Sequence, residues 1–180
     1  MLQIKRMHLI NWHYISETTA VFGKHVNFIT GDNASGKSTL LDALQTALFV
    51  HSKDFNLSNQ INKSRGGARD ARQLMDYMRG TLTISTDISH LNLEKGQKYL
   101  RPHAVRTWIA VELFDDVQSL FHVVAFTGEI NSDSVDDSSI LKHWMWLDGR
   151  LDNYPMTVDE TGGKRIISFR EFKALHTDGE

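Results

Sequence analysis

The 180 residues are 41% hydrophobic and 23% charged, which is the composition of an ordinary globular protein of one domain or slightly more. The formal net charge of −2 excludes an overall basic field that would attract nucleic acid, and the absence of cysteine excludes disulfides and thiolate metal sites. We find neither a signal peptide nor an apolar run near the ~20 residues of a membrane-spanning helix, so we expect a cytoplasmic protein.

Three strands and a helix are predicted in the first part of the chain. Alternating residues over 2–12 and 15–22 predict two strands, and a short apolar run over 25–30 predicts a third, buried strand. Leucines and alanines at helical spacing over 40–48 predict a helix. The glycine-containing segment 31–39 therefore lies between a predicted strand and a predicted helix.

Segment 31–39 matches the phosphate-loop pattern G-x-x-x-x-G-K-[ST] in the context that this pattern requires. Gly31 and Gly36 permit a backbone that brings its N–H groups close to phosphate oxygens. Lys37 adds a mobile positive charge, the Ser38 hydroxyl is suited to ligate Mg²⁺, and the helix N-terminus favours an anion. We therefore predict that the chain binds ATP with Mg²⁺.

The middle of the chain is polar. Residues 51–69 predict a long surface loop, and residues 70–79 predict a helix that Gly80 ends. A second polar connection follows over 81–98.

From residue 99 onward the pattern is typical of strands. Strands are predicted over 105–114, 119–130, 142–147 and 165–169. The acidic, serine-rich segment 131–139 predicts a mobile loop. Ser168 and Glu171 match a capping box, so we expect a helix that starts there and has few residues left, as in a truncated chain. The expected fold is α/β, with a mixed sheet around the phosphate-loop helix (about 1–85) and an antiparallel β-subdomain (about 99–170).

The chain resembles the amino-terminal head segment of SMC/Rad50-type ABC ATPases in residues 10–14 and 31–45. Within that family it looks closest to the condensin-like ATPase subunit of Wadjet plasmid-defence systems (JetC, related to MksB). Segments 72–80, 99–101 and 107–115 carry this narrower similarity. The resemblance extends to about residue 130.

The resemblance implies that residues 1–180 are the N-terminal lobe of a split ATPase head. Such heads need a C-terminal lobe of the same protein, and two copies of the head sandwich two ATP molecules. ATP hydrolysis by these heads drives DNA loop extrusion. The partners that the resemblance implies are double-stranded DNA and kleisin-like and other Wadjet or condensin subunits. Because the sequence contains neither a signature motif nor a Walker B motif, we expect little or no ATP hydrolysis by the chain alone.

The resemblance also implies roles for individual residues. Asn33 matches an asparagine near the γ-phosphate, and Trp12 and His13 lie near the base and ribose, although aromatic packing explains them equally well. The nucleotide-binding set is Asn33, Ala34, Ser35, Gly36, Lys37, Ser38 and Thr39, with Ser38 at the metal. Candidate contacts to DNA or to the partner head are Arg65, Arg72 and Arg79; for these the alternatives are a solvated loop and, for Arg79, a structural role.

Two other functions stay open. One is a self-contained small P-loop phosphotransferase or kinase, which would need an acceptor site with a carboxylate base and a parallel sheet. The other is a non-catalytic module whose binding is controlled by the nucleotide. A fragment of a split head would behave much like such a module, so the sequence does not separate the two.

Overall fold

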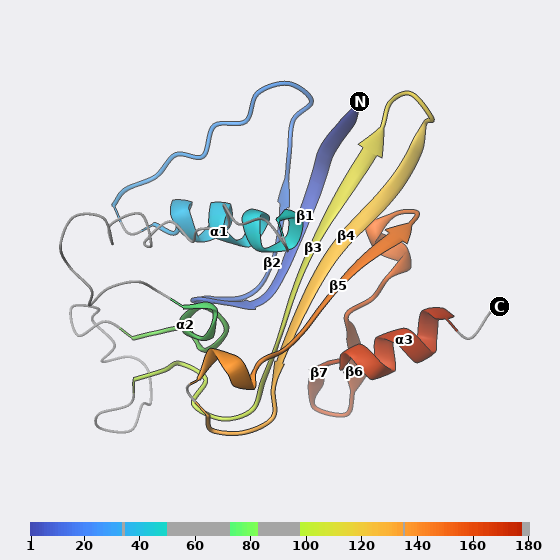
Figure 1. Cartoon of the computed structure of the whole chain (residues 1–180). Helices are drawn as coiled ribbons and strands as arrows, with labels where there is room; N and C mark the ends of the chain where they lie inside the picture. The colour runs from blue at the N-terminus through green and yellow to red at the C-terminus, as the bar shows by residue number, and fades with distance from the viewer. Residues whose placement is uncertain (34, 50–72, 83–97, 135, 178–180) are drawn as a thin grey trace.

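A five-stranded antiparallel sheet forms the centre of the molecule (Figure 1). The computed structural model describes residues 1–33, 35–49, 73–82, 98–134 and 136–177. The strands are β1 (Leu2–Trp12), β2 (Ile15–Val21), β3 (Val105–Asp115), β4 (Leu120–Ile130) and β5 (Leu141–Asp148), in the order β2-β1-β3-β4-β5. The strands predicted in these five places are confirmed.

Helices and a hairpin cover the two faces of the sheet (Figure 1). On one face lie α1 (Lys37–Leu48) and α2 (Leu74–Arg79). On the other lie the hairpin of β6 (Thr157–Glu160) and β7 (Gly163–Ile166), and α3 (Phe169–Thr177). Two short 3₁₀ helices, η2 (Asp137–Ser139) and η3 (Leu151–Asn153), complete the described elements. None of the helices in the described parts is long and apolar enough to span a membrane.

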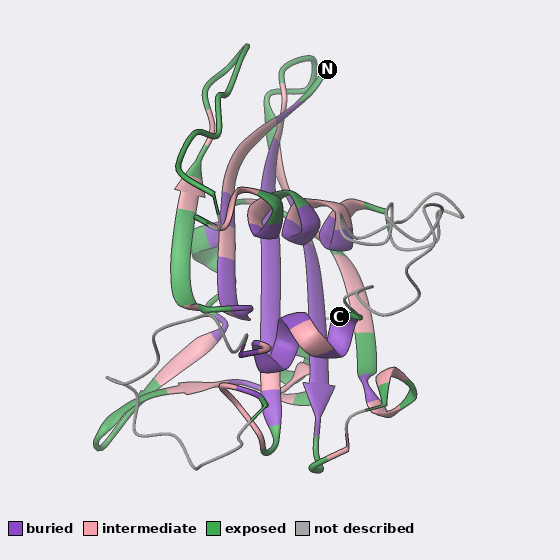
Figure 2. Cartoon of the chain, turned by 90° about the vertical axis from the view of Figure 1, so that its left-hand side faces the viewer, coloured by how far each residue is buried: buried purple, intermediate pink, exposed green. Residues whose placement is uncertain are grey.

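Successive residues of β3 supply two separate hydrophobic cores. Ile109 packs in the core that includes Ala43 of α1. Its neighbour Trp108 faces the opposite core, where its ring lies 4.9 Å from that of Phe172 in α3. Because side chains alternate along a strand, the central strands are buried on both faces. Figure 2 shows this burial along the middle strands and the exposure of an edge strand.

The mixed sheet that the sequence predicted is not found among the described residues, where every pair of neighbouring strands is antiparallel. Short turns join β1 to β2 and β3 to β4, and only antiparallel strands can be joined in this way. Residues 2–21 and 105–148 share this sheet, so the expected phosphate-loop core and the β-rich part are structurally continuous.

The predicted buried strand at 25–30 is wrong. The segment belongs to neither sheet, and Val26 and Phe28 are 67% and 85% exposed. β1 is already paired on both sides, by β2 and β3, so it offers no free edge to a further strand. The apolar side chains of 25–30 consequently face solvent.

The remaining predictions fall near their observed elements. Helices 40–48 and 70–79 correspond to α1 and α2, and Gly80 ends α2 with a left-handed φ of 70°. The predicted strand 165–169 is shifted, because β7 ends at Ile166 and Phe169 already begins α3. Most of the predicted loops 51–69 and 81–98 lies outside the described residues.

The capping box at Ser168 and Glu171 is confirmed. The Ser168 backbone N–H donates to the Glu171 carboxylate at 2.8 Å, and the Glu171 N–H donates to the Ser168 hydroxyl at 3.2 Å. These bonds satisfy two backbone donors at the start of α3. The Ser168 backbone N–H, together with the Ser168 hydroxyl and Arg165, lowers the pKa of Glu171 to about 2.

Arg79 at the end of α2 is fully buried and joins three segments of the chain. Its guanidinium donates to the carbonyls of residues 101–103 and to those of Ser132 and Ser134. Burial lowers the pKa of Arg79. In this structure Arg79 therefore faces the interior and not a DNA or partner-head surface, and its geometry fits the structural alternative.

We predict that Arg79→Met lowers the free energy of unfolding by about 3 kcal/mol, because five carbonyls lose a charged donor inside the protein. Urea unfolding measures the change. Arg170→Met, at an exposed position of α3, is the control and should stay within about 0.5 kcal/mol of the parent. Equal losses in the two variants would contradict the role given to Arg79.

We predict that Glu171→Gln flattens the acid side of the stability profile. The pKa of Glu171 falls from 4.5 to about 2 on folding, so the carboxylate stabilises the fold above pH 4.5, and this stabilisation is lost as the pH falls toward 2. Thermal unfolding measured across this range should show a shallower decline for Glu171→Gln than for the parent. Glu160→Gln, which removes another carboxylate bound to Arg165, is the matched control.

Candidate nucleotide-binding site

The loop that precedes α1 requires glycine at both ends of its pattern. Gly31 and Gly36 have positive φ angles of 151° and 90°. A Cβ on Gly31 would lie 2.6 Å from the Ser35 hydroxyl oxygen, whereas a Cβ on Gly36 would meet no atom of the described residues within 4 Å. Gly36 is thus required for its backbone angles alone, and the space beside it stays open at the start of α1.

The Lys37 ammonium lies across this loop. It donates to the carbonyl oxygens of Gly31 at 2.7 Å and Asp32 at 2.6 Å, and to the Ser35 hydroxyl at 3.4 Å. A bound phosphate would offer oxygens that carry more negative charge than these carbonyls, so the ammonium can exchange one set of acceptors for the other.

The first turn of α1 suits an anion. It contains no acidic residue, and among the described residues no side chain caps its N-terminus. The backbone N–H groups of this turn and the helix dipole therefore remain available for phosphate oxygens. The exposed side chain of Ser38 offers one oxygen to Mg²⁺. The described residues hold no cluster of three or more His, Cys, Asp or Glu that could bind a metal ion.

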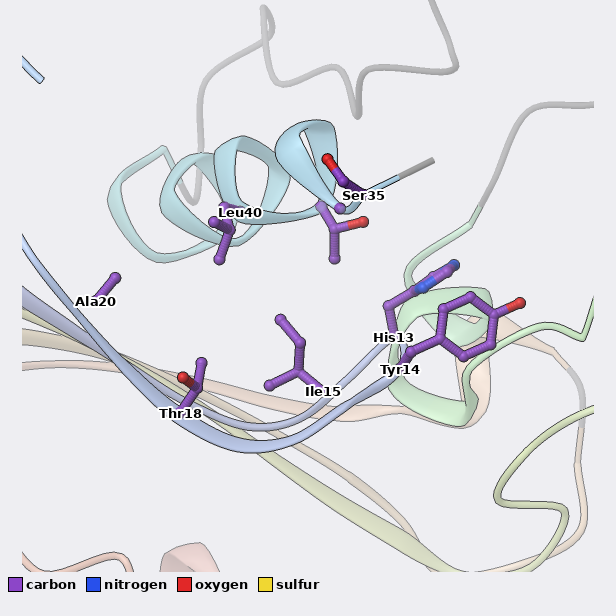
Figure 3. A pocket seen from close by; sticks show the side chains of 9 residues that line it. His13, Tyr14, Ile15, Thr18, Ala20, Ser35 and Leu40 are labelled. Carbon is purple, nitrogen blue, oxygen red and sulfur yellow. The ribbon is translucent and has the colours of Figure 1, made fainter. Parts of the chain in front are cut away.

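A cleft of about 420 Å³ opens between this loop and the turn that joins β1 to β2 (Figure 3). This is the size of a small-molecule site. The turn and β2 contribute one wall, and the loop with the first turn of α1 contributes the other. The cleft is lined by His13, Tyr14, Ile15, Thr18, Ala20, Ser35, Gly36, Thr39 and Leu40.

His13 and Tyr14 form the aromatic part of the cleft. Their rings meet edge to face, 4.2 Å apart. Tyr14 is 44% exposed and is held by a 2.7 Å hydrogen bond from its hydroxyl to the Thr81 carbonyl. An exposed and fixed aromatic ring is suited to stack on a nucleobase. The sequence predicted no binding role for Tyr14 or Ile15, although they directly follow Trp12 and His13 in the chain.

Trp12, in contrast, packs in the interior. Its ring stacks on Tyr77 of α2 at 4.7 Å, and its indole N–H donates to the Thr39 carbonyl of α1 at 2.8 Å. Trp12 is therefore a packing residue. Of Trp12 and His13, the two residues expected near the base and ribose, only His13 lines the cleft.

The nucleotide set that the sequence predicted lies around the start of α1. Asn33, Ser35 and Ser38 are exposed, and Thr39 is buried. Ala34 is outside the described residues, as are Arg65 and Arg72, so the structure does not place these three.

Two comparisons with known proteins concern this part of the chain. A family model described as the P-loop containing region of AAA domain matches residues 4–62. The DNA double-strand break repair Rad50 ATPase of Thermoplasma acidophilum is 32% identical over 77 residues, which make up 43% of this chain and 8% of that protein. The chain thus spans a small part of this relative's length. Together the two matches support a P-loop ATPase head of the SMC/Rad50 type.

We predict that Trp12→Phe lowers the free energy of unfolding by about 1 kcal/mol, because the phenyl ring keeps the stack on Tyr77 but loses the buried hydrogen bond from the indole to the Thr39 carbonyl. Urea unfolding tests this. Trp146→Phe changes an indole that is 55% exposed and should alter stability by less than about 0.5 kcal/mol. Indistinguishable effects in the two variants would argue against a stabilising role of the hydrogen bond from Trp12 to Thr39.

Proposed function

We propose that this chain is the ATP-binding N-terminal head segment of an SMC-like DNA motor ATPase. The observation that carries the proposal is the glycine loop that opens into α1 beside the cleft, with Lys37 across the loop and no acidic residue in the first helical turn. The matches to the P-loop region and to the Rad50 ATPase support it.

In this proposal residues 33–39 hold the phosphates. The backbone N–H groups of the first turn of α1 and the Lys37 ammonium bind the β- and γ-phosphates, and Asn33 lies on the γ side. Thr39 lies toward the α-phosphate. Ser38 supplies a protein oxygen to Mg²⁺, which when bound neutralises charge that develops on the phosphates.

We further propose that a C-terminal lobe of the same protein covers the apolar surface beside the loop. Val26, Phe28, Leu41 and Phe49 are all at least 46% exposed. A narrow groove of about 160 Å³, lined by residues of β2, of segment 25–30 and of α1, separates that segment from the helix. Exposed apolar side chains that gather in this way are typical of an interaction surface.

The finer assignment rests on the resemblance in 72–80, 99–101 and 107–115. From it we propose the JetC-type subunit of a Wadjet plasmid-defence system, acting by DNA loop extrusion. The proposed partners are a second copy of the head across two ATP molecules, kleisin-like subunits and double-stranded DNA. Arg65 and Arg72 remain proposed contacts to DNA or to the partner head.

A self-contained kinase is the second candidate. The antiparallel sheet disfavours it, because P-loop kinases are built on parallel sheets with helices on both faces. A non-catalytic nucleotide-controlled module would share the binding site of the proposed head. Turnover measurements distinguish the enzyme from the other two.

We predict that Lys37→Ala abolishes Mg·ATP binding by the purified chain, because the loop loses its only lysine charge on the phosphates. Titration calorimetry measures the affinity. Lys142→Ala, on the exposed face of edge strand β5, should bind like the parent.

The purified parent chain should show no sustained ATP turnover, with or without DNA. Retained affinity in Lys37→Ala would overturn the site. Sustained turnover by the parent chain would overturn the split head and favour a self-contained enzyme.

A further inference from the structure

One side chain outside the cleft holds the turn that forms its aromatic wall. Arg101 donates through Nε to the Asn11 side-chain oxygen at 2.9 Å. Its Nη1 donates to the His13 carbonyl at 2.8 Å and to the Met78 carbonyl at 3.2 Å, and its Nη2 donates to the Ile15 carbonyl at 3.1 Å. Arg101 thus binds the β1–β2 turn on both sides of Tyr14 and joins that turn to α2.

The turn needs such support because its backbone is strained. Asn11 and His13 have φ angles of 53° and 51°, in the left-handed region that residues with a Cβ rarely adopt. The His13 N–H donates to the Tyr77 carbonyl at 2.6 Å, which fixes the turn to α2 from the other side. A strained turn persists only where its surroundings hold it.

The chain also passes very close to this turn at Gly80. A Cβ on Gly80 would lie 2.6 Å from the His13 carbonyl oxygen and 3.2 Å from Nη1 of Arg101. The glycine therefore lets the end of α2 approach both groups. The left-handed Gly80 and the guanidinium of Arg101 together determine where the His13 backbone lies.

The chemistry of Arg101 suits positioning. Burial lowers the pKa of Arg101 to about 10, so the guanidinium stays charged at neutral pH. Within the described chain its partners are one amide oxygen and three backbone carbonyls, which lie on two segments, residues 11–15 and α2. A planar fork with several donors can bind these acceptors together, whereas the single ammonium of lysine cannot.

We propose that Arg101 is a positioning residue for the nucleotide: it holds the His13–Tyr14 wall against which the base stacks, without touching the nucleotide itself. Arg101 is not among the residues that line the cleft. This inference rests on the proposed function, since it requires ATP with its phosphates at residues 33–39. In this proposal the affinity for ATP has two contributions: the loop binds the phosphates, and the turn binds the base.

The test compares Mg·ATP with Mg·tripolyphosphate, which has the phosphates but no base. Arg101→Lys keeps the charge and loses the fork, so we expect its ATP affinity to fall about tenfold, the size of one lost base–aromatic stack. Its tripolyphosphate affinity should stay at the parent value. Arg150→Lys, at an exposed position, is the matched control and should leave both affinities unchanged.

A second variant protects the test against simple loss of folding. Tyr14→Ala removes the proposed stacking ring and leaves Arg101 in place, so it should show the same selective loss for ATP. Because both residues act through one wall, the double variant Arg101→Lys/Tyr14→Ala should lose no more than either single variant. Circular dichroism and urea unfolding accompany each variant.

Each other outcome has a distinct meaning. The positioning role is overturned if Arg101→Lys loses no ATP affinity, or if it loses ATP and tripolyphosphate affinity equally. It is also overturned if the affinity losses of the two single variants add up in the double variant. If the parent chain binds tripolyphosphate as tightly as ATP, the phosphate site stands and the base wall is wrong. If the parent chain binds neither, the proposed function itself fails.

Discussion

The hydrogen bond from the Trp12 indole to the Thr39 carbonyl holds α1 on the sheet. Trp12 is completely buried on β1, and its ring lies on Tyr77, whose hydroxyl donates to the buried Asp42 carboxylate in α1. Further along the helix, the Trp144 indole donates to a second α1 carbonyl, that of Thr46. Hydrogen bonds are directional, so these contacts determine the position of α1 along the sheet and its rotation about its own axis more narrowly than apolar packing alone would. The same contacts also position the phosphate loop, because the loop continues directly into α1.

Two arginines extend this fixed arrangement to the other side of the cleft. Arg79, at the end of α2, binds carbonyls from two other segments, and Arg101 binds the β1–β2 turn. Both use the guanidinium as a multiple donor to backbone oxygens in the interior, where an unpaired carbonyl is costly. The two walls of the cleft are therefore connected through α2: the Tyr77 hydroxyl reaches α1, and the Tyr77 carbonyl accepts from the His13 N–H of the turn. A nucleotide would enter between two surfaces that are each already positioned.

The side of α1 that faces segment 25–30 is organised differently. Val26 and Phe28 extend into solvent, and β2 presents a free edge to the same region. An apolar segment before a phosphate loop gains stability only when another strand or layer covers it. The exposed segment and the well-packed opposite side of the sheet together fit a lobe that is complete in its core and incomplete beside its loop, as the proposed split head requires.

The sequence by itself determined the features that depend on residues near one another in the chain. The glycine spacing of 31–39, the alternation of the long strands, and the capping box of Ser168 and Glu171 all act within one element or one turn, and each is found where the pattern predicted it. Patterns of this kind reflect backbone angles and burial, which neighbours in sequence largely control.

Only the tertiary structure decided the contacts between distant residues. Arg79 bonds to Ser134, 55 positions away, and Arg101 bonds to His13, 88 positions away, so no local pattern could distinguish these interior donors from solvated charges. The apolar run at 25–30 misled for the same reason: its pattern shows that it favours burial, but only the tertiary structure shows that it lies outside both sheets and is exposed.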